Sequence, residues 1–504
     1  MALGRAFSVA VLGLDGQIVE IEADITSGLP GVHLVGLPDA ALQESRDRVR
    51  AAITNYNNNL WPQSRLTLAL SPATLPKMGS VYDLALAAAV LSAQRKKRWR
   101  HLETAVVLGE LALDGRVRPV RGVLPAVLAA KSAGWGVAVV PADNLPEASL
   151  VDGIEVWGVR TLAHLLNWLR GSAHLDERIN APAPEPEQPA DLADVVGQTQ
   201  ARFAVEVAAA GSHHLMLTGP PGVGKTMLAQ RLPGLLPPLS DGESLEVTAI
   251  HSVAGLLSDA TPLITRPPFV APHHSSSVAA LVGGGSGMAR PGAVSRAHRG
   301  VLFLDECAEI GVSSLEALRT PLEEGEIRLA RRDGVACYPA RFQLVLAANP
   351  CPCAPADPRD CVCAAGVKRR YLGRLSGPLL DRVDLRVEMH PVRMSVFAGS
   401  EPESTGEVRR RVTMARDAAA QRWQAHGFRT NAEVSGTLLR RRFRPGHAAM
   451  APLRTALDRG VLSIRGMDKT LRVAWTLTDL AGRTSPGRDE VATALSFRQP
   501  GPSR

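Results

Sequence analysis

Aromatic residues are scarce in this chain of 504 residues. Phe, Trp and Tyr together make up 4% of the sequence, although hydrophobic residues as a group reach 45%. No apolar run approaches the roughly 20 residues that a membrane-spanning helix needs. The N-terminal segment carries an Arg before an apolar stretch, but Asp15 interrupts that stretch and no small-residue cleavage site follows. We therefore expect a cytoplasmic protein with no membrane partner.

Cysteine is sparse outside one short segment. Two of the six cysteines stand alone, and the other four crowd together as Cys351, Cys353, Cys361 and Cys363. Structural disulfides are rare in cytoplasmic proteins, so the cluster points to a metal more than to bridges. Four thiolates suit tetrahedral zinc, although the C-x-C spacing is less typical than C-x-x-C. Structural zinc and reduced thiols in a surface loop both stay open.

The charge of the chain is unevenly distributed. The formal net charge is +8, and residues 407–504 contain 19 Lys or Arg against 8 Asp or Glu. The rest of the chain is therefore slightly acidic. A basic C-terminal segment suits a polyanion such as nucleic acid, while a solvated Arg-rich helical surface explains the same charge equally well.

Composition and periodicity divide the chain into parts and predict an α/β protein. Residues 1–170 mix short apolar strands with Ala- and Leu-rich helical stretches. Residues 171–190 are rich in Pro, Ala and Glu without periodicity, which is typical of a linker. Residues 191–392 alternate strand and helix patterns around a predicted parallel sheet, and residues 393–504 favour helices.

A phosphate-binding loop is the most specific motif of the sequence. Residues 214–218 predict a buried strand, and MLAQRL after the motif favours a helix. Between them lies a complete G-x-x-x-x-G-K-T loop, in the strand–loop–helix context that it requires. Its backbone N–H groups and the helix N-terminus would hold the phosphates of ATP. Lys225 would reach the β- and γ-phosphates and Thr226 would hold Mg²⁺. The loop consists of Gly219, Pro220, Pro221, Gly222, Val223, Gly224, Lys225 and Thr226.

A second acidic element follows about eighty residues later. Residues 301–304 (VLFL) predict a central parallel strand, which ends in Asp305 and Glu306. Asp305 would bind Mg²⁺ through water, and Glu306 would polarise the attacking water as general base. The alternative is an ordinary strand that ends in two acids, which the upstream phosphate loop makes the weaker interpretation.

The order of these elements resembles AAA+ ATPases, and among them the magnesium-chelatase-like proteins of the competence protein ComM (YifB) type. The resemblance covers nearly the whole chain. It implies an ATP- and Mg²⁺-dependent, hexameric motor that acts on single-stranded or branched DNA, drives branch migration in recombination during natural transformation, and works with recombination proteins. The segments that carry it are residues 25–53, 68–87, 191–211, 271–306, 339–353 and 462–480.

The resemblance also assigns roles to individual residues. Asn349, which ends the predicted strand 344–348, would contact the γ-phosphate and orient water. Arg382 would be an arginine finger on the neighbouring subunit's nucleotide, with Arg374 as second choice and a structural salt bridge as the alternative. Lys469 stands where a second sensor is usually arginine, so Arg465 or Arg472 could substitute. Trp475 also replaces an expected arginine.

The N-terminal block resembles the α+β domain of Lon proteases, in residues 107–144 above all. Such peptidases need a Ser nucleophile that a Lys activates. The serine region here contains Ser80 without the usual Pro-Ser-Ala-Gly arrangement, and Leu124 stands where the base is expected. A serine without a base is a poor nucleophile. We therefore expect a non-proteolytic, structural or partner-binding domain.

Three further segments could contact DNA or metal. Residues 321–342 predict a hairpin whose tip carries Arg331 and Arg332, which would meet phosphates if the hairpin faced a central pore; a solvated hairpin is the alternative. His273 and His274 lie in a Gly- and Ser-rich insertion, where a loop or structural role is favoured over metal. The basic run 95–100 favours a solvated loop over a DNA contact.

Two rival functions share the same motor. A chelatase subunit would hydrolyse ATP to help a partner insert Mg²⁺ into a porphyrin, but such subunits lack the Lon-like N-terminal block. A protein-remodelling or protease motor is the other rival, and the missing Ser–Lys pair argues against its protease form. Stimulation of ATP turnover by DNA, by a chelatase partner or by a protein substrate would separate the three.

Overall fold

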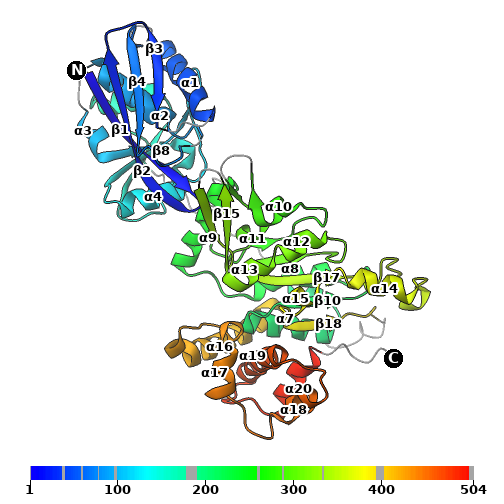
Figure 1. The fold of residues 1–504 in the computed structure, drawn as a ribbon. Helices are drawn as coiled ribbons and strands as arrows, with labels where there is room; N and C mark the ends of the chain where they lie inside the picture. The colour runs from blue at the N-terminus through cyan, green and yellow to red at the C-terminus, as the bar shows by residue number, and fades with distance from the viewer. Residues whose placement is uncertain are drawn as a thin grey trace.

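In the computed structural model the chain forms three bodies in chain order, with the N-terminal strands at one end and the C-terminal helices at the other (Figure 1). Most of the predicted linker lies outside the described residues, as do Arg332 and positions 96–98 of the basic run. Of Arg331 only the backbone is described. The structure describes residues 2–36, 40–57, 61–77, 79–95, 99–177, 190–257, 262–285, 289–331, 334–392 and 402–498.

The N-terminal body is built on a mixed seven-stranded sheet with the order β3-β4-β2-β1-β5-β8-β9. β1 and β2 form an antiparallel hairpin, and β2 alternates between buried and more exposed residues. That alternation is expected of a strand with one covered face. The strands of this body, including the short pair β6 and β7, are β1 (Ala2–Leu12), β2 (Asp15–Thr26), β3 (Gly31–Val35), β4 (Arg65–Ser71), β5 (Ala105–Val107), β6 (Glu110–Leu111), β7 (Val117–Arg118), β8 (Val137–Pro141) and β9 (Glu155–Val159).

Helices cover both faces of this sheet. α1, α2 and α6 share one hydrophobic core, and α2 is buried along most of its length because small Ala side chains let it lie close to the strands. α4 and α5 contribute to a second core on the other side. The helices are α1 (Ala40–Tyr56), α2 (Asp83–Arg95), α3 (Arg100–Thr104), α4 (Val123–Ser132), α5 (Leu145–Ala148) and α6 (Leu162–Leu169).

The start of the predicted linker packs onto this body. Leu175 is buried in the core that α1, α2 and α6 share, and Asp176 forms a β-bridge with Gly158 and an ion pair with Arg160. Residues 171–176 therefore belong structurally to the N-terminal body. The Pro- and Glu-rich composition that predicted a linker begins only after them, and an apolar residue such as Leu175 gives the earlier segment something to bury.

The central body contains a parallel five-stranded sheet with the order β11-β14-β17-β10-β18. Its inner strands are predominantly apolar, as expected of a parallel sheet covered on both faces. β10 lies between β17 and β18, so the phosphate loop leaves the sheet next to the end of β17. The strands are β10 (Leu215–Thr218), β11 (Phe269–Val270), β14 (Val301–Leu304), β17 (Gln343–Ala348) and β18 (Leu385–Glu388).

Helices and two short hairpins complete the central body. The hairpins are β12 (Gly283–Gly284) with β13 (Arg290–Pro291), and β15 (Glu326–Arg331) with β16 (Gly334–Pro339). The second hairpin lies where the sequence predicts one. The helices are α7 (Thr199–Gly211), α8 (Lys225–Leu235), α9 (Asp241–Ala254), α10 (Val278–Val282), α11 (Ala293–Arg296), α12 (Val312–Glu316), α13 (Arg319–Glu324), α14 (Ala365–Leu372) and α15 (Gly377–Leu380).

The C-terminal body, residues 402–498, is helical and is called the lid below. Its longest helices, α16 and α19, pack against α7 of the central body. Trp475 fills the lid core, and its ring faces the Arg422 guanidinium with 4.4 Å between the carbon of that group and the ring centroid. The helices are α16 (Thr405–Trp423), α17 (Gly436–Arg441), α18 (Ala451–Asp458), α19 (Ile464–Leu480) and α20 (Arg488–Ser496). Among the described residues, none of the helices is long and apolar enough to cross a membrane.

The N-terminal body contacts the central body at two places. Helix α4 packs against α9, and the Gly122 N–H donates to the Ser252 carbonyl at 3.2 Å. The turn between β1 and β2 lies on β16: a Cβ built on Gly13, whose φ is +69°, would approach the Cys337 carbonyl oxygen to 2.6 Å. Glycine is therefore required here by both backbone angle and space. The contact covers one side of the β15–β16 hairpin.

Candidate active site

The phosphate loop forms an open turn at the carboxyl edge of the central sheet. Gly222 and Gly224 have φ angles of +76° and +91°, which glycine adopts without steric cost. A Cβ built at either position would meet nothing within 4 Å. The loop leads into the 11-residue helix α8, whose first N–H groups have no partner within the helix and attract anions. The geometry suits a polyphosphate.

Lys225 folds back onto this loop. Its ammonium group donates to the carbonyl oxygens of Gly219 at 2.6 Å and Pro220 at 2.8 Å, and to Oδ1 of Asn349 at 3.0 Å. Burial lowers the pKa of Lys225, and the nearby Asp305 and Glu306 carboxylates oppose that shift. All three acceptors are neutral, so a phosphate oxygen would be a stronger partner for this cation.

Thr226 and Asp305 meet across the site. The Thr226 hydroxyl donates to Oδ2 of Asp305 at 2.6 Å, and Oδ1 of Asp305 accepts the Glu306 N–H at 2.9 Å. A hydroxyl and a carboxylate oxygen are the ligands that Mg²⁺ prefers, so these residues fit the ion. Bound there with a nucleotide, Mg²⁺ would neutralise phosphate charge.

Glu306 follows Asp305 directly and points a half-exposed carboxylate out of the strand end. Its φ is +47°, an uncommon value for a residue with a side chain. Oε2 of Glu306 lies 3.1 Å from Nδ1 of His274, whose ring contacts that of His273 in a tilted arrangement with 4.1 Å between centroids. The sequence placed these histidines in a loop without a partner. The structure shows that the loop reaches the carboxylate proposed to activate water.

Strand register explains why residues far apart in sequence converge. Thr218 of β10 is opposite Ala348 of β17, and Leu304 of β14 is opposite Leu346. Because all three strands are parallel, their carboxyl ends meet at one edge, where the phosphate loop, Asp305 and Asn349 follow. The structure thus brings together the residues predicted for ATP and Mg²⁺.

The two candidate finger arginines lie away from the loop lysine. Arg382 donates to the Pro378 carbonyl at 2.6 Å and pairs with Glu323 of α13. Arg374 contacts the Ala308 carbonyl and the Glu309 carboxylate, both at 3.1 Å. These partners all lie outside the phosphate loop of the same chain. Both arginines thus pair with a carboxylate of their own chain, as the salt-bridge alternative predicts, and the finger role stays a prediction.

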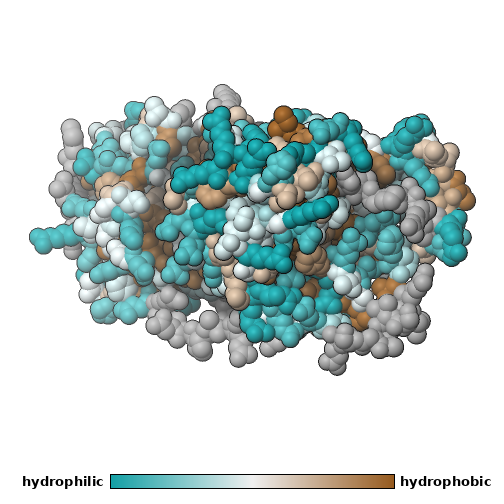
Figure 2. Space-filling model, turned by 90° about the horizontal axis from the view of Figure 1, so that it is seen from below, coloured by the Kyte–Doolittle hydropathy of each residue, from teal (hydrophilic) through white to brown (hydrophobic). Residues whose placement is uncertain are grey.

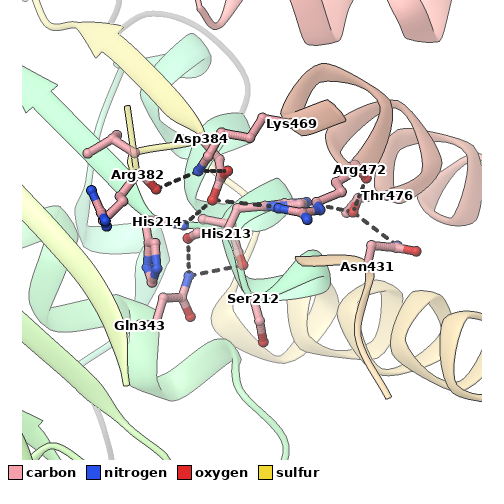
Figure 3. A network of polar contacts seen from close by, with 12 residues as sticks. Ser212, His213, His214, Gln343, Arg382, Asp384, Asn431, Lys469, Arg472 and Thr476 are labelled. Atoms are coloured by element: carbon pink, nitrogen blue, oxygen red, sulfur yellow. Dashed lines mark hydrogen bonds and ion pairs between the residues drawn. The ribbon is translucent and has the colours of Figure 1, made fainter. Parts of the chain in front are cut away.

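Lys469 of the lid is engaged inside the protein. Its ammonium group donates to Oδ1 of Asp384 at 2.6 Å and to the Arg382 carbonyl oxygen at 2.7 Å, as Figure 3 shows. Burial lowers the pKa of Lys469, and Asp384 counteracts the shift. The alternatives Arg465 and Arg472 differ: Arg465 is exposed, whereas Arg472 is largely buried and donates to the Val434 carbonyl at 2.7 Å.

Buried histidines surround the same carboxylate. Oδ2 of Asp384 accepts the His214 N–H at 3.0 Å and lies 3.8 Å from Nδ1 of His213. Burial lowers the pKa of both histidines to about 4. Burial alone would raise the pKa of Asp384, but Lys469 and the two rings hold it well below its usual range. The sequence showed no signal for this network, because its members come from three distant segments of the chain, at residues 213–214, 384 and 469.

The four clustered cysteines converge in the segment between β17 and α14. Their sulfur atoms all lie within 4.8 Å of one another. Three Sγ–Sγ distances are 3.4, 3.5 and 3.6 Å, close to the edge of about 3.8 Å in a tetrahedron with Zn–S bonds of about 2.3 Å. The backbone N–H of Cys363 and nearby Lys368 lower the pKa of Cys361 to about 6. The donor set fits zinc.

The remaining predicted residues are placed as follows. The hydroxyl of Ser80 donates to Glu110, and Leu124 is fully buried in an apolar core, so it offers no base. Arg331 ends β15, and its side chain lies outside the described residues. The DNA contact of Arg331 and Arg332 therefore stays a prediction.

Comparison with known proteins assigns the chain to a family. Models described as magnesium chelatase subunit ChlI match residues 191–397 and 21–144, and a C-terminal ChlI model matches residues 402–498. The competence protein ComM of Haemophilus influenzae is 38% identical, over 99% of this chain and 98% of that protein. The chain belongs to the ComM/YifB family of magnesium-chelatase-like proteins.

Two further relatives extend this family assignment. YifB of Salmonella typhimurium is 38% identical, over 99% of this chain and 97% of that protein. An uncharacterized protein of Mycobacterium tuberculosis is 82% identical over the full length of both chains. The resemblance stated from the sequence is thus confirmed, and membership in this AAA+ family supports an ATPase.

Proposed function

We propose that this protein is an ATP- and Mg²⁺-dependent AAA+ motor that forms a hexamer and acts on DNA, in branch migration or helicase reactions of recombination. The observation that carries the ATPase part is the convergence of Lys225, Thr226, Asp305, Glu306 and Asn349 at one sheet edge. Lys225 would neutralise phosphate charge, Asn349 would orient the attacking water, and Glu306 would accept its proton.

The DNA part of the proposal has two supports. One is the competence protein among the relatives, because competence concerns DNA uptake. The other is the basic lid. Seen from below, the surface is mainly hydrophilic and its hydrophobic side chains are scattered (Figure 2), so this face suits a charged partner better than an apolar one.

Arg382, with Arg374 as second choice, would serve a neighbouring subunit's nucleotide.

We also propose the domain organisation and the zinc site. The domains are residues 1–170, a Lon-like non-proteolytic unit; 191–392, the ATPase core; and 393–504, the lid. A linker in 171–190, which the packed residues 171–176 shorten, joins the N-terminal unit to the ATPase core. The four cysteines would hold one structural zinc, and the support is their mutual distance.

The test of the motor function is steady-state ATPase activity. Purified protein is assayed without DNA and with single-stranded DNA, duplex DNA and a four-way junction, and Glu306→Gln serves as the inactive control. Stimulation by single strands or junctions that the variant loses supports the proposal. An ATPase rate indifferent to every DNA would contradict the DNA part.

The family models favour a second candidate, a chelatase-type ATPase subunit. Its specific prediction is that ATP turnover responds to a chelatase partner protein and not to DNA. The same assay, with the porphyrin-binding partner in place of DNA, distinguishes the two functions.

A further inference from the structure

Lys469 is held at the joint between the lid and the central sheet, not at the nucleotide loop. Its side chain is nine-tenths buried, and its two acceptors are the carboxylate of Asp384 and the backbone carbonyl of Arg382. Both belong to the segment that leads into β18. In Figure 3 the Lys469 side chain reaches from α19 across to this segment.

A second lid-side cation acts on the same backbone. Arg498, which follows α20, donates to the Val383 carbonyl at 3.2 Å. Lid cations therefore bind two consecutive carbonyl groups, at 382 and 383. Asp384 is tied from the other side, because its N–H donates to the His214 carbonyl at 3.0 Å and its carboxylate accepts the His214 N–H. The backbone after Arg382 is thus fixed jointly by lid and core.

The contact extends along one face of α19. Thr476 lies two helical turns after Lys469 on the same face, and its hydroxyl is 2.8 Å from Nε2 of His213. His213 is fully buried beside Asp384. Helix α19 therefore contacts the central body through both Lys469 and Thr476. A rotation of the helix would displace these two contacts together.

The side chain of Arg382 points the other way. Its guanidinium group binds the Pro378 carbonyl and Glu323, both in the central body. The backbone of Arg382 would move with the lid, while its side chain rests on the central body. A movement of the lid would therefore change how far the Arg382 guanidinium extends toward a neighbouring subunit. Misplacement of a catalytic group by about 1 Å can lower a rate by about 100-fold.

We propose that Lys469 is a positioning residue that sets Arg382 for the neighbouring subunit's nucleotide through the Arg382 carbonyl and Asp384, and that it does not itself contact ATP. This inference rests on the proposed oligomeric ATPase. It gives the lid a second role, because the position of the lid in one subunit would control hydrolysis in the next.

Mixed oligomers test the inference with full-length chains. Arg382→Ala subunits keep a complete hydrolysis site but lack the finger. Glu306→Gln subunits cannot hydrolyse ATP but keep the finger. Neither is active alone, and an equal mixture is expected to regain ATPase activity because one variant supplies Arg382 to the other's site.

The decisive donor is the double variant Glu306→Gln/Lys469→Met. We expect its rescue of Arg382→Ala subunits to be at least about tenfold weaker than that by Glu306→Gln alone. A matched donor, Glu306→Gln/Arg459→Met, removes an exposed lid cation and is expected to rescue fully. Assembly of each donor is checked by analytical ultracentrifugation.

If the Glu306→Gln/Lys469→Met donor does not assemble, the donor Glu306→Gln/Lys469→Gln takes its place. The glutamine amide can still donate to the Arg382 carbonyl without the charge, so intermediate rescue is expected. Full rescue by the Lys469 donors overturns the inference and leaves the motor function intact. Absence of rescue by Glu306→Gln itself overturns the finger role of Arg382, and this inference with it, while the DNA-stimulated ATPase of the unmodified protein still tests the motor separately.

Discussion

The loop lysine and Asn349 contact each other at the edge of the central sheet. Lys225 binds two carbonyl groups and Oδ1 of Asn349, so the cation is held inside the loop that the phosphates would enter. Exchange of neutral acceptors for phosphate oxygens costs little, because charge-assisted hydrogen bonds are roughly twice as strong. The loop therefore offers a phosphate group a cation whose position is fixed by hydrogen bonds.

Glu306→Gln should separate binding from hydrolysis. The amide cannot accept a proton from water, so ATP turnover is expected to fall by about 10²–10⁴-fold. Nucleotide affinity should change little, because the Glu306 carboxylate lies against His274 and not on the phosphate loop. Turnover and fluorescent-nucleotide binding measure the two effects. Lys225→Ala is the contrasting variant and should lose binding as well; equal loss of binding in both variants would contradict the assigned roles.

At the scale of elements, β17 is anchored at both ends. Its first residue, Gln343, donates to the carbonyl groups of Ala208 and His213, and the N–H of Leu344 donates to Nδ1 of His214 at 3.0 Å. Its far end leads to Asn349. Nδ1 of His214 acts here as an acceptor, which requires an unprotonated nitrogen. The sheet therefore depends on a neutral histidine.

This dependence predicts a loss of stability in acid. The pKa of His214 is about 4 in the folded protein and about 6.5 in an unfolded chain. Between these values the unfolded state binds more protons, so stability is full above about pH 6.5 and falls as the pH drops toward 4. In His214→Asn the amide oxygen can still accept the Leu344 N–H without titrating.

The comparison is made by chemical denaturation at several pH values. Between about pH 4 and 6.5 the unfolding free energy should rise with pH less steeply in His214→Asn than in the unmodified protein. The difference in slope corresponds to up to about one bound proton. His213 and Asp384 interact with His214, so their pKa values can also change in the variant. Groups elsewhere titrate equally in both proteins and cancel in the difference. Identical slopes would mean that His214 does not carry the effect.

The cysteine segment is the second element with a testable role. Purified protein is expected to contain about one zinc ion per chain, and Cys351→Ser should lower the zinc content sharply, since a structural site needs four ligands. Cys307→Ser is the control, because that thiol lies buried outside the cluster. Elemental analysis and the thermal unfolding midpoint provide the readouts. A zinc-free native protein would leave the cluster as reduced thiols.

At the scale of the whole molecule, the basic lid predicts salt-dependent DNA binding. Arg441 and Arg444 are exposed at the end of α17. Their joint replacement by Gln should weaken binding similarly for all DNA sequences and reduce the slope of log affinity against log salt by about 2. Fluorescence anisotropy over a salt series measures both. Arg116→Gln, exposed in the N-terminal body, should leave the slope unchanged.

Local sequence patterns predicted the residues of the proposed ATP site. The loop 219–226 and the acids after strand 301–304 follow from fixed spacing around apolar strands. The match of a magnesium chelatase family model to residues 191–397 confirms the family resemblance that these motifs indicated. The hairpin at 326–339 also followed from its turn signal. Such features depend on neighbours in the sequence, so composition and periodicity suffice to find them.

Tertiary structure decided what distant segments do to one another. The contact of His274 with Glu306, the burial of Lys469 against Asp384, and the cover of the β15–β16 hairpin by the β1–β2 turn each join residues from separate stretches of chain. No local pattern encodes such pairs, because a buried ion pair depends on packing that excludes water around both partners. Local patterns therefore predicted the residues of the proposed ATP site, and the fold decided which distant residues contact them and which ones join the lid to the central sheet.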